Sequence, residues 1–376
     1  MKKNDNNMDD FLKFFMKHIN NAYPKVIEKD TDYLDSLETA LRDYSEAVRE
    51  YDCLQDEQSE IDNLIENILE AVKLTYEGKT AEAYTCIKAF TDAYNGYLAC
   101  IKNLSEISCG TEYKTLYRGR RAEEITELKE MFHRPFSQRA FIPTERYSIP
   151  GLPCLYLGGS AYICWREIGK PSHDQFYVSR FEADENVKIL DLAPPIRQNK
   201  KETDKFRDYC VIWPLVCACS FKVKEKNRIF HSEYIIPQLL MQVVINTDNL
   251  DGIRYVSSHK PSMYCGYIAP LYISYAFPAP YEANKQYSSS LIKKFKATCA
   301  ICMHDLSQLS AANKLTVKNS ACENGVEKAL EIQYENSSRR FGTISIDMNS
   351  FSEYEHTSYF KTEDMLYKFP AKDIEI

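Results

Sequence analysis

The stretch from Arg146 to Glu167 constrains the fold of this chain more than any other part of it. It contains Pro150-Gly151, a pair whose fixed and permissive dihedral angles favour a tight turn. The apolar run 154–157 predicts a short buried strand, and Gly158-Gly159 ends it. Ser160 is suited to cap a helix, because its hydroxyl can accept a hydrogen bond from a free amide of the first turn. The stretch therefore predicts a turn, a strand, a glycine-rich break and a helix in direct succession.

The length of 376 residues is enough for two or three domains, each with a packed core. Hydrophobic residues make up 44% of the chain and charged residues 27%, which is typical of a soluble globular protein. The net charge of −7 argues against broad non-specific binding to nucleic acids, since neutralising phosphates requires an excess of Lys and Arg. A local basic pocket is compatible with this charge.

The sequence predicts a cytoplasmic protein that is not inserted in a membrane. No apolar run approaches the roughly 18 residues that span a bilayer, and the polar start of the chain lacks the apolar region of a secretory signal. The 13 cysteines are an odd number, and some of them, such as Cys217 and Cys219, fall in predicted core segments. Free buried thiols in a reducing compartment explain this pattern better than a disulfide framework does.

The N-terminal part of the chain has the apolar spacing of helices from residue 8 to about 105, with few Pro or Gly residues. The clearest apolar stripe covers 61–72, and a further candidate helix covers 83–104. We expect a helical module at residues 1–108, arranged as a small bundle. A structural cap or a dimerisation element is the simplest role for this module, and a ligand sensor is the alternative.

Residues 109–280 alternate between strand and helix patterns and predict a central mixed α/β domain. The strand candidates, rich in β-branched and aromatic residues, are 113–118, 176–181, 187–192 and 252–258. The apolar segment 208–221 predicts a buried helix, although Pro214 within it would kink or break a helix. A Pro- and Ser-rich hinge then precedes a small β-rich appendage at 281–376. The expected fold class is α+β.

Three polar side chains fall on the central stretch: Arg146 before the turn, Tyr156 at the strand end and Glu167 two turns into the helix. Taken singly, each has an ordinary explanation, as a surface arginine, one of 27 tyrosines, and a residue of a solvated helix face. Their convergence on one strand–helix unit favours a functional site. Arg118, in the basic cluster 118–121, fits a second phosphate contact, and a solvated strand end is the alternative.

This set of residue types suits a particular chemistry. Two arginines can hold a diphosphate through charge-assisted, often bidentate hydrogen bonds. A tyrosine can stack on a flat heterocycle, and a carboxylate can bind ribose hydroxyls and stabilise an oxocarbenium-like centre while a glycosidic bond breaks. The set therefore suits cleavage of the base–ribose bond of a dinucleotide. It does not suit hydride transfer, and the sequence has no Gly-x-Gly-x-x-Gly after a strand, no Walker-type phosphate loop and no His-Glu-x-x-His.

The chain also contains a pair of cysteines that looks like part of a metal site. Cys299-Ala-Ile-Cys302 has the spacing of zinc ligands, and His304 lies close to it in the sequence. No second Cys pair follows at zinc-finger distance, so we expect no metal site.

The central stretch resembles the RES domain, a family named for its Arg, Glu and Ser. The family pattern has an arginine, a glycine five residues later, a tyrosine ten residues after the arginine, and a glutamate eleven residues after the tyrosine. Arg146, Gly151, Tyr156 and Glu167 match these spacings. The stretch also looks like the longer, multi-domain branch of the family, and the resemblance covers residues 112 to about 275.

RES proteins resemble ADP-ribosyltransferases in fold, and characterised members are toxins that degrade NAD, in some cases by phosphorolysis. The resemblance implies that Arg146 holds the phosphates or ribose of NAD, that Tyr156 packs on the nicotinamide side, and that Glu167 orients the ribose and stabilises the transition state. NAD would be the substrate, so no cofactor is implied. The aromatic–Asn pair that usually follows the arginine is Tyr147-Ser148 here.

The serine of the family has two candidate positions in this chain. We favour Ser232, which would lie at a strand start, where the fold places its late motif. Ser257 or its neighbour Ser258 is the competing position. Glu233 is a further candidate for substrate binding, since transferases of this fold use a late-strand glutamate.

The sequence thus predicts an NAD-consuming enzyme that breaks the nicotinamide–ribose bond, with phosphate, water or a protein side chain as acceptor. Family biology suggests a toxin or phage-defence effector, restrained by an antitoxin or other regulatory protein, by self-association, or by a flanking domain. Two alternatives stay open. One is an ADP-ribosyltransferase that modifies a macromolecule, and the other is a non-catalytic module that binds a nucleotide or a partner.

Overall fold

The computed structural model describes residues 10–11, 13–19, 22–28, 31–93, 101–104, 115–194, 203–224, 228–259, 270–305, 314–317, 330–333 and 357–376. The chain divides into two compact units that interleave its segments: unit 1 comprises 1–102, 143–150 and 188–268, and unit 2 comprises 103–142, 151–187 and 269–376. Helices and strands occur in both, and the N-terminal region is helical, which confirms the predicted α+β class. The domain boundaries predicted after residues 108 and 280 stay a prediction. None of the helices described is long and apolar enough to cross a membrane.

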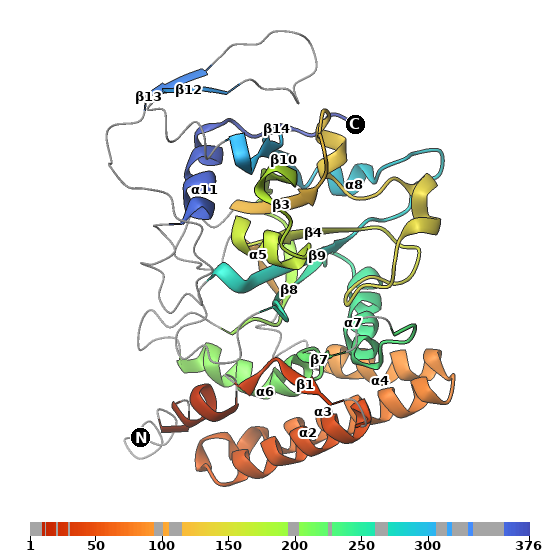
Figure 1. Ribbon diagram of the computed structural model, residues 1–376. Coiled ribbons are helices and arrows are strands. Elements are labelled where there is room, and N and C mark those ends of the chain that lie inside the picture. Colours follow the sequence, from red (N-terminus) through yellow and green to blue (C-terminus); the bar gives the residue numbers. More distant parts are fainter. Residues whose placement is uncertain are drawn as a thin grey trace. The chain divides into compact units, whose positions relative to one another are not determined.

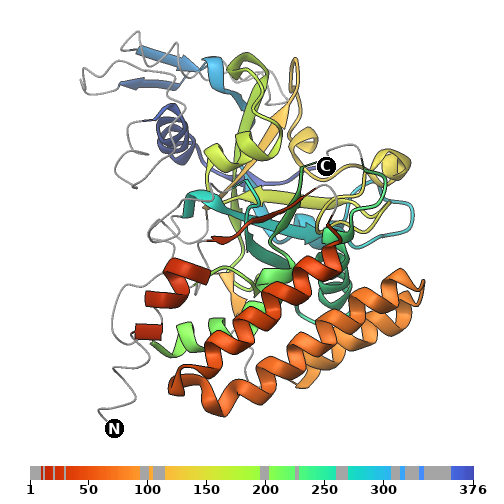
Figure 2. The same cartoon turned by 60° about the horizontal axis from the view of Figure 1, so that its bottom comes forward.

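The described N-terminal residues of unit 1 include the α-helices α2 (Tyr33–Arg49), α3 (Gln58–Tyr76) and α4 (Thr80–Ala93). They lie side by side in Figures 1 and 2, and α3 packs against both of the others. The apolar residues of the stripe predicted at 61–72 are buried, which confirms that helix and its inward face. Asp32 caps α2, because its carboxylate accepts a hydrogen bond from the Leu34 amide at 2.7 Å.

The helix expected at 83–104 was wrong at its C-terminal end. α4 is described as Thr80–Ala93, residues 94–100 lie outside the described ones, and Ile101–Asn103 form strand β2. The amide of Leu104, the next residue, donates to the carbonyl of Val187 at 2.8 Å. Apolar spacing carries no information about a hydrogen-bond partner so far along the chain, and short apolar runs fit helix and strand equally well.

The buried helix expected around Pro214 is α6 (Thr203–Ala218). Proline lacks an N–H, so the carbonyl of Cys210, four residues earlier, loses its helical donor. The hydroxyl of Tyr44 on α2 donates to this carbonyl at 2.5 Å, and both residues are buried. Trp213 packs beside Tyr44 with ring centroids 4.5 Å apart. A side chain from the N-terminal helices therefore replaces the hydrogen bond that the proline removes.

We expect Tyr44→Phe to lower the free energy of unfolding by about 1–3 kcal/mol, because it takes a donor away from the buried carbonyl of Cys210. In a Pro214→Ala background the new N–H can donate to the same carbonyl, so the cost of Tyr44→Phe should fall below about 1 kcal/mol. Urea unfolding of the four proteins in this cycle measures the coupling. Equal costs in the two backgrounds would contradict the explanation.

Unit 1 also contains two parallel strand pairs and a further helix. β6 (Lys188–Asp191) pairs with β8 (Gly252–Val256), β1 (Lys25–Ile27) pairs with β7 (Phe221–Val223), and the helix is α7 (Ile235–Ile245). Asp191 and Arg254 are directly opposite each other in the first pair, with Oδ1 and Nη1 2.8 Å apart and both side chains 2% exposed. Breaking a buried pair of this kind is strongly destabilising, so it favours this register of β6 and β8.

Unit 2 contains an antiparallel sheet with the strand order β14-β10-β5-β3-β4-β9. The strands are β3 (Thr115–Arg121), β4 (Cys154–Gly158), β5 (Phe176–Ala183), β9 (Ile273–Pro278), β10 (Phe295–Ala297) and β14 (Lys372–Asp373), and β11 (Ile301–Cys302) also pairs with β5. The strands predicted at 154–157 and 176–181 are confirmed. The strand predicted at 113–118 forms β3 from residue 115 on, and its first two residues lie outside the described ones.

The C-terminal region contributes strands to this same sheet. β10, β11 and β14 pair within it, and β12 (Lys314–Val317) pairs antiparallel with β13 (Leu330–Gln333). Strands were predicted for the region and are present among its described residues, beside helical ones, while its β-rich character stays a prediction. The region also contains helix α11 (Ser358–Lys368), drawn in blue in Figure 1, which packs on β5.

Helix α5 (Ala161–Glu167) packs closely on β3 and β4, because each strand presents a glycine to it. A Cβ built on Gly158 would lie 2.6 Å from Cγ2 of Ile163 and 2.7 Å from Sγ of Cys164. A Cβ built on Gly119 would lie 2.8 Å from Cβ of Cys164. Side chains at either position would push the helix away, so the two glycines set the distance between helix and sheet.

Gly158→Ala is expected to lower the free energy of unfolding by about 1–3 kcal/mol, since the added methyl group overpacks the contact with Ile163 and Cys164. Cys164→Ala removes one of the two clashing atoms and should recover part of that loss in the double variant. Urea unfolding of the single and double variants provides the test. Strictly additive losses would show that the methyl group does not meet Cys164.

Candidate functional site

The strand–helix unit predicted from the central stretch is present, with β4 leading into α5 (Figure 1). Gly151 has a φ of 79°, the left-handed conformation that a turn with proline at the preceding position requires. Ser160 caps α5 as expected, because its Oγ accepts a hydrogen bond from the Ile163 amide at 3.0 Å. Glu167 is the last residue of α5. The local fold of the stretch is therefore the predicted one.

The carboxylate of Glu167 is exposed and is held from one side by the sheet. Its Oε1 accepts a hydrogen bond from Oγ of Ser274 at 3.4 Å. Ser274 is buried on β9, directly opposite Gly158 of β4. A buried hydroxyl thus contacts the exposed carboxylate of Glu167.

Tyr156 lies on the same side of the sheet as α5. Side chains alternate along a strand, so Tyr156 shares a face with Gly158, and a Cβ at Gly158 points at the α5 residues Ile163 and Cys164. The side chain of Tyr156 is half-buried. Its ring and the helix that ends at Glu167 therefore cover one face of β4.

Arg118 on β3 contacts the same strand. Its Nη1 donates to the carbonyl of Tyr156 at 2.6 Å. Tyr117 of β3 pairs with Gly158 of β4, so Arg118 donates to the backbone of β4 close to this pair. A Cβ at Gly119 would meet Cys164 of α5, so the preceding residue, Arg118, leaves β3 on the opposite face of the sheet. Tyr156 and Glu167 therefore lie on the α5 side of the sheet in unit 2, and Arg118 contacts the main chain of β4.

The guanidinium of Arg118 is in an unusual environment for a cation. Burial lowers its pKa to about 10, and the neighbouring guanidiniums of Arg120 and Arg134 act in the same direction. Its Nε is buried and has no hydrogen-bond partner among the described residues. Buried cations are normally paired with an anion, and a guanidinium binds phosphate in a bidentate manner. The environment of Arg118 is therefore one that a bound oxyanion would stabilise.

Cys164 on α5 feels the charges of both Arg118 and Glu167. Its Sγ donates to the carbonyl of Tyr117 at 3.2 Å. Burial raises the pKa of this thiol to about 12, Glu167 contributes in the same direction, and Arg118 opposes it. The thiol therefore stays protonated and unreactive. Cys164 therefore serves as a packing residue. Arg118 and Glu167 both lie close enough to affect its pKa.

Arg146, whose predicted contact with a phosphate or ribose stays a prediction, binds main-chain carbonyls of unit 1. Its Nη1 donates to the carbonyl of Cys219 at 2.9 Å and lies 3.5 Å from that of Glu233, and its Nη2 donates to the carbonyl of Phe221 at 2.8 Å. Its guanidinium carbon lies 5.0 Å from the ring centroid of Tyr234. These contacts join the end of α6, β7 and the turn before α7, so Arg146 stabilises unit 1.

Tyr147 and Ser148 are buried in the core of unit 1, each with 1% of its surface exposed. Tyr147 packs against Tyr255 of β8 with ring centroids 4.3 Å apart. The carbonyl of Ser148 accepts a hydrogen bond from Nε2 of Gln238 on α7 at 3.3 Å. Both residues of this pair therefore serve packing.

Ser232 was expected at a strand start, and the structure corrects this. Residues Ser232–Tyr234 form a 3-10 turn that leads directly into α7. Pro237 falls in the first turn of α7, where its missing N–H leaves no helical hydrogen bond unmade. Ser232 is 9% exposed and lies near Tyr76, whose pKa is raised to about 12 by burial while a hydrogen bond with Ser232 lowers it.

Glu233 is a buried carboxylate, 1% exposed. Its Oε1 lies 3.0 Å from Nδ1 of His231, whose ring stacks on that of Tyr234 at 4.6 Å. Its Oε2 is buried without a hydrogen-bond partner among the described residues. His231 was not singled out from the sequence, and the only signal available was its place two residues before a candidate glutamate.

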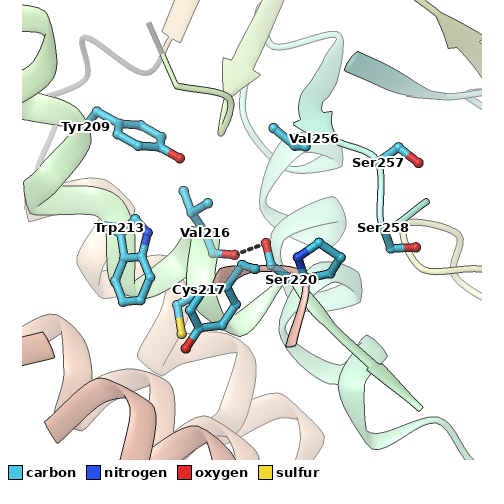
Figure 3. Close-up of a pocket in the computed structure, with 10 residues that line it drawn as sticks. Tyr209, Trp213, Val216, Cys217, Ser220, Val256, Ser257 and Ser258 are labelled. Carbon is cyan, nitrogen blue, oxygen red and sulfur yellow. Dashed lines mark hydrogen bonds between the residues drawn. The ribbon is translucent and has the colours of Figure 1, made fainter. Parts of the chain in front are cut away.

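Ser257, the competing serine, lies at a small cavity after β8 (Figure 3). The cavity holds about 20 Å³, room for a water molecule but not for a nucleotide. Tyr209 and Trp213 of α6 line it together with Ser258. Oγ of Ser257 accepts a hydrogen bond from the His259 amide at 3.0 Å. Ser257 thus orders the loop that follows β8.

The predicted site residues are divided between the two units. Unit 2 contains Arg118, Tyr156 and Glu167, and unit 1 contains Arg146, Tyr147, Ser148, Ser232, Glu233 and Ser257. Within the part of the chain that the structure describes, no group of three or more His, Cys, Asp or Glu side chains is placed to hold a metal ion.

The chain is similar to a protein of Bacillus subtilis (strain 168) named "Putative toxin YopC". The two are 31% identical over 282 residues, which cover 69% of this chain and 63% of that relative. The chain therefore spans less than two thirds of the relative's length. No family model matches the chain, and no solved structure is significantly similar to it. The resemblance to the RES domain stays a prediction.

His133 is buried near the arginines of unit 2 and is neutral. Its Nε2 accepts a hydrogen bond from the Ser288 amide at 3.0 Å, and its Nδ1 lies 2.7 Å from the carbonyl of Arg134, so Nδ1 carries the proton. Burial lowers the pKa of His133 to about 4, Arg118 contributes in the same direction, and the hydrogen bond to Arg134 opposes it.

The pH dependence of stability tests this state of His133. The pKa of the folded state is below the unfolded value of about 6.5, so the stabilisation is complete above that pH and is lost as the pH falls towards about 4. His133→Gln can keep an acceptor for the Ser288 amide and does not titrate. Between pH 7 and pH 4, wild-type unfolding free energy should fall by about 2–3 kcal/mol more than that of the variant. Parallel pH profiles in urea unfolding would contradict this.

Proposed function

We propose that this protein is an NAD-consuming enzyme that breaks the bond between nicotinamide and ribose, and that it acts as a toxin in the cytoplasm. The observation that carries the proposal is that Tyr156 and Glu167 lie on the same side of β4 in unit 2, while the buried guanidinium of Arg118 donates to the main chain of that strand. A desolvated guanidinium, an aromatic ring and an exposed carboxylate are the groups that cleavage of a dinucleotide at a base–ribose bond requires.

In the proposed reaction each of these residues has one role. Arg118 binds a phosphate of NAD, and Tyr156 packs against the nicotinamide ring. Glu167 binds a ribose hydroxyl and stabilises the positive charge that develops on the ribose as the glycosidic bond lengthens. The electron pair of that bond passes to the nicotinamide nitrogen, which leaves as neutral nicotinamide. Phosphate, water or a protein side chain then bonds to the ribose carbon.

The roles proposed for the residues of unit 1 rest on the family resemblance. The resemblance to the RES family assigns NAD contacts to Arg146 and the serine role to Ser232. The donors of Arg146 are engaged by main-chain carbonyls, so we expect its substitution to act on stability as well as on activity. Glu233, also in unit 1, has a buried Oε2 without a hydrogen-bond partner among the described residues, which could accept from a further donor.

The toxin role rests on the similarity to "Putative toxin YopC" and on the chemistry proposed. Unrestrained NAD consumption would harm the cell that contains the enzyme. We therefore propose that the activity is restrained by an antitoxin or another regulatory protein, or by self-association. A place in phage defence would be consistent with such restraint.

The proposal is tested by incubating the purified full chain with NAD, with and without phosphate, and measuring nicotinamide release by chromatography. Glu167→Gln keeps the shape of the side chain and should lower the rate by about 100-fold or more. Arg118→Met should raise KM about tenfold, the loss of one phosphate contact of roughly 1.4 kcal/mol. Glu124→Gln, an equal change at an exposed position of unit 2, serves as the matched control and should leave the rate unchanged.

The outcome of this assay decides the proposal. Release of nicotinamide by the wild type and the control but not by Glu167→Gln would support it, and a dependence on phosphate would identify phosphate as the acceptor. Equal release by wild type and Glu167→Gln would remove Glu167 from the chemistry. For Arg146→Ala, thermal unfolding measured beside the assay separates a loss of folded protein from a loss of turnover.

A further inference from the structure

A side chain of the C-terminal helix α11 caps the start of α5. Glu363 of α11 accepts a hydrogen bond from the Ala161 amide at 2.5 Å through Oε1, and Ala161 is the first residue of α5. Amides of the first helical turn have no partner inside the helix. The hydroxyl of Ser160 accepts a hydrogen bond from the amide of Ile163, and Glu363 accepts one from a second amide of the first turn. The negative charge of Glu363 also interacts favourably with the positive end of the helix dipole.

An aromatic cluster fixes the beginning of α11 against α5. The ring of Tyr359 on α11 lies 5.2 Å from that of Tyr162 and 5.4 Å from that of Trp165, both on α5. The hydroxyl of Tyr359 lies 3.3 Å from Nε2 of His173, in the turn that precedes β5. Tyr359 is buried. This end of α11 is therefore packed into unit 2.

A buried arginine fixes the other end of α11. Arg180 of β5 is 3% exposed. Its Nε donates to the carbonyl of Leu366 at 3.0 Å, and its Nη2 donates to the carbonyl of Phe369 at 2.6 Å. Both carbonyls lie at the C-terminal end of α11, where Phe369 is the C-cap, and the carbonyl of Leu366 also accepts a hydrogen bond from the Phe369 amide at 3.2 Å. Contacts that do not involve Glu363 hold both ends of α11. The position of the Glu363 carboxylate beside α5 therefore does not depend on its own hydrogen bond.

We propose that Glu363 is a positioning residue for Glu167: by capping the first amide of α5 it holds the carboxylate at the other end of that helix in its reactive place. This inference rests on the proposed function. α5 has seven residues and is about 10 Å long, so a shift at Ala161 is carried to Glu167 rather than absorbed along the way. A misplacement of about 1 Å in a reacting group can cost about 100-fold in rate.

Three variants of the full chain test the proposal by nicotinamide release. Glu363→Ala removes the acceptor and should lower kcat about 10- to 100-fold with KM changed less than about threefold. Glu363→Gln keeps an acceptor without the charge and should restore kcat to within about threefold of the wild type. Asp364→Asn removes the same charge from the next position, where the carboxylate pairs with Lys368 at 3.0 Å, and should leave kcat unchanged.

Hydrogen exchange of the amides at 161–163 is measured on the same proteins, since this readout does not depend on activity. It should quicken about tenfold or more in Glu363→Ala and stay near the wild-type rate in the other two variants. Unchanged exchange in Glu363→Ala, or unchanged kcat, overturns the proposal. If the wild type releases no nicotinamide, the function proposed above fails, and Glu363 then has no reaction to serve, so the positioning role fails with it even where the exchange shows that the cap exists.

Discussion

The close approach of α5 to the sheet is the constraint on which the candidate site depends. Gly119 and Gly158 leave no room for a side chain, and Cys164 packs against both positions. This contact fixes the height of the helix above β3 and β4, and therefore the height of the carboxylate at its end. A larger residue at either glycine would move Glu167 without touching it. The packing of α5 on the two glycines thus determines where the carboxylate of Glu167 lies.

Two arginines that look alike in the sequence have opposite environments in the structure. Arg146 donates to main-chain carbonyls, which takes up the donors that a phosphate would need. Arg118 has one carbonyl partner, a buried Nε without a hydrogen bond among the described residues, and other guanidiniums nearby. Desolvation without a counter-charge is costly, so a cation in this state gains more from a bound anion than a cation that is already satisfied. For the proposed reaction we therefore assign the phosphate contact to Arg118 before Arg146.

Much of the local structure could be predicted from the sequence, because its causes are local. The turn at Gly151, the strand at 154–157 and the cap at Ser160 each follow from the properties of one or two residues. The helical stripe at 61–72 follows from spacing alone. The class of the fold follows from the succession of such elements.

The parts that failed or were missed depend on partners far apart in the chain. The amide of Leu104 donates to the carbonyl of Val187, where a helix had been expected. The carboxylate of Glu363 reaches the amide of Ala161 across about 200 residues, and Ser274 reaches Glu167 across about 100. No spacing pattern records such pairs, since they exist only after the sheet has formed. The same holds for Tyr44, which makes Pro214 tolerable within α6.

The central claim is that this chain breaks the glycosidic bond of NAD with Glu167. The most direct test is mass spectrometry of the ribose product formed from NAD in water labelled with oxygen-18, with phosphate present. The account predicts that the wild type yields nicotinamide and a product containing ADP-ribose, in which the ribose carries the labelled oxygen, a phosphate group or a protein side chain. Glu167→Gln should yield neither nicotinamide nor such a product. Recovery of intact NAD from the folded wild-type protein, or the same products from both proteins, would contradict it.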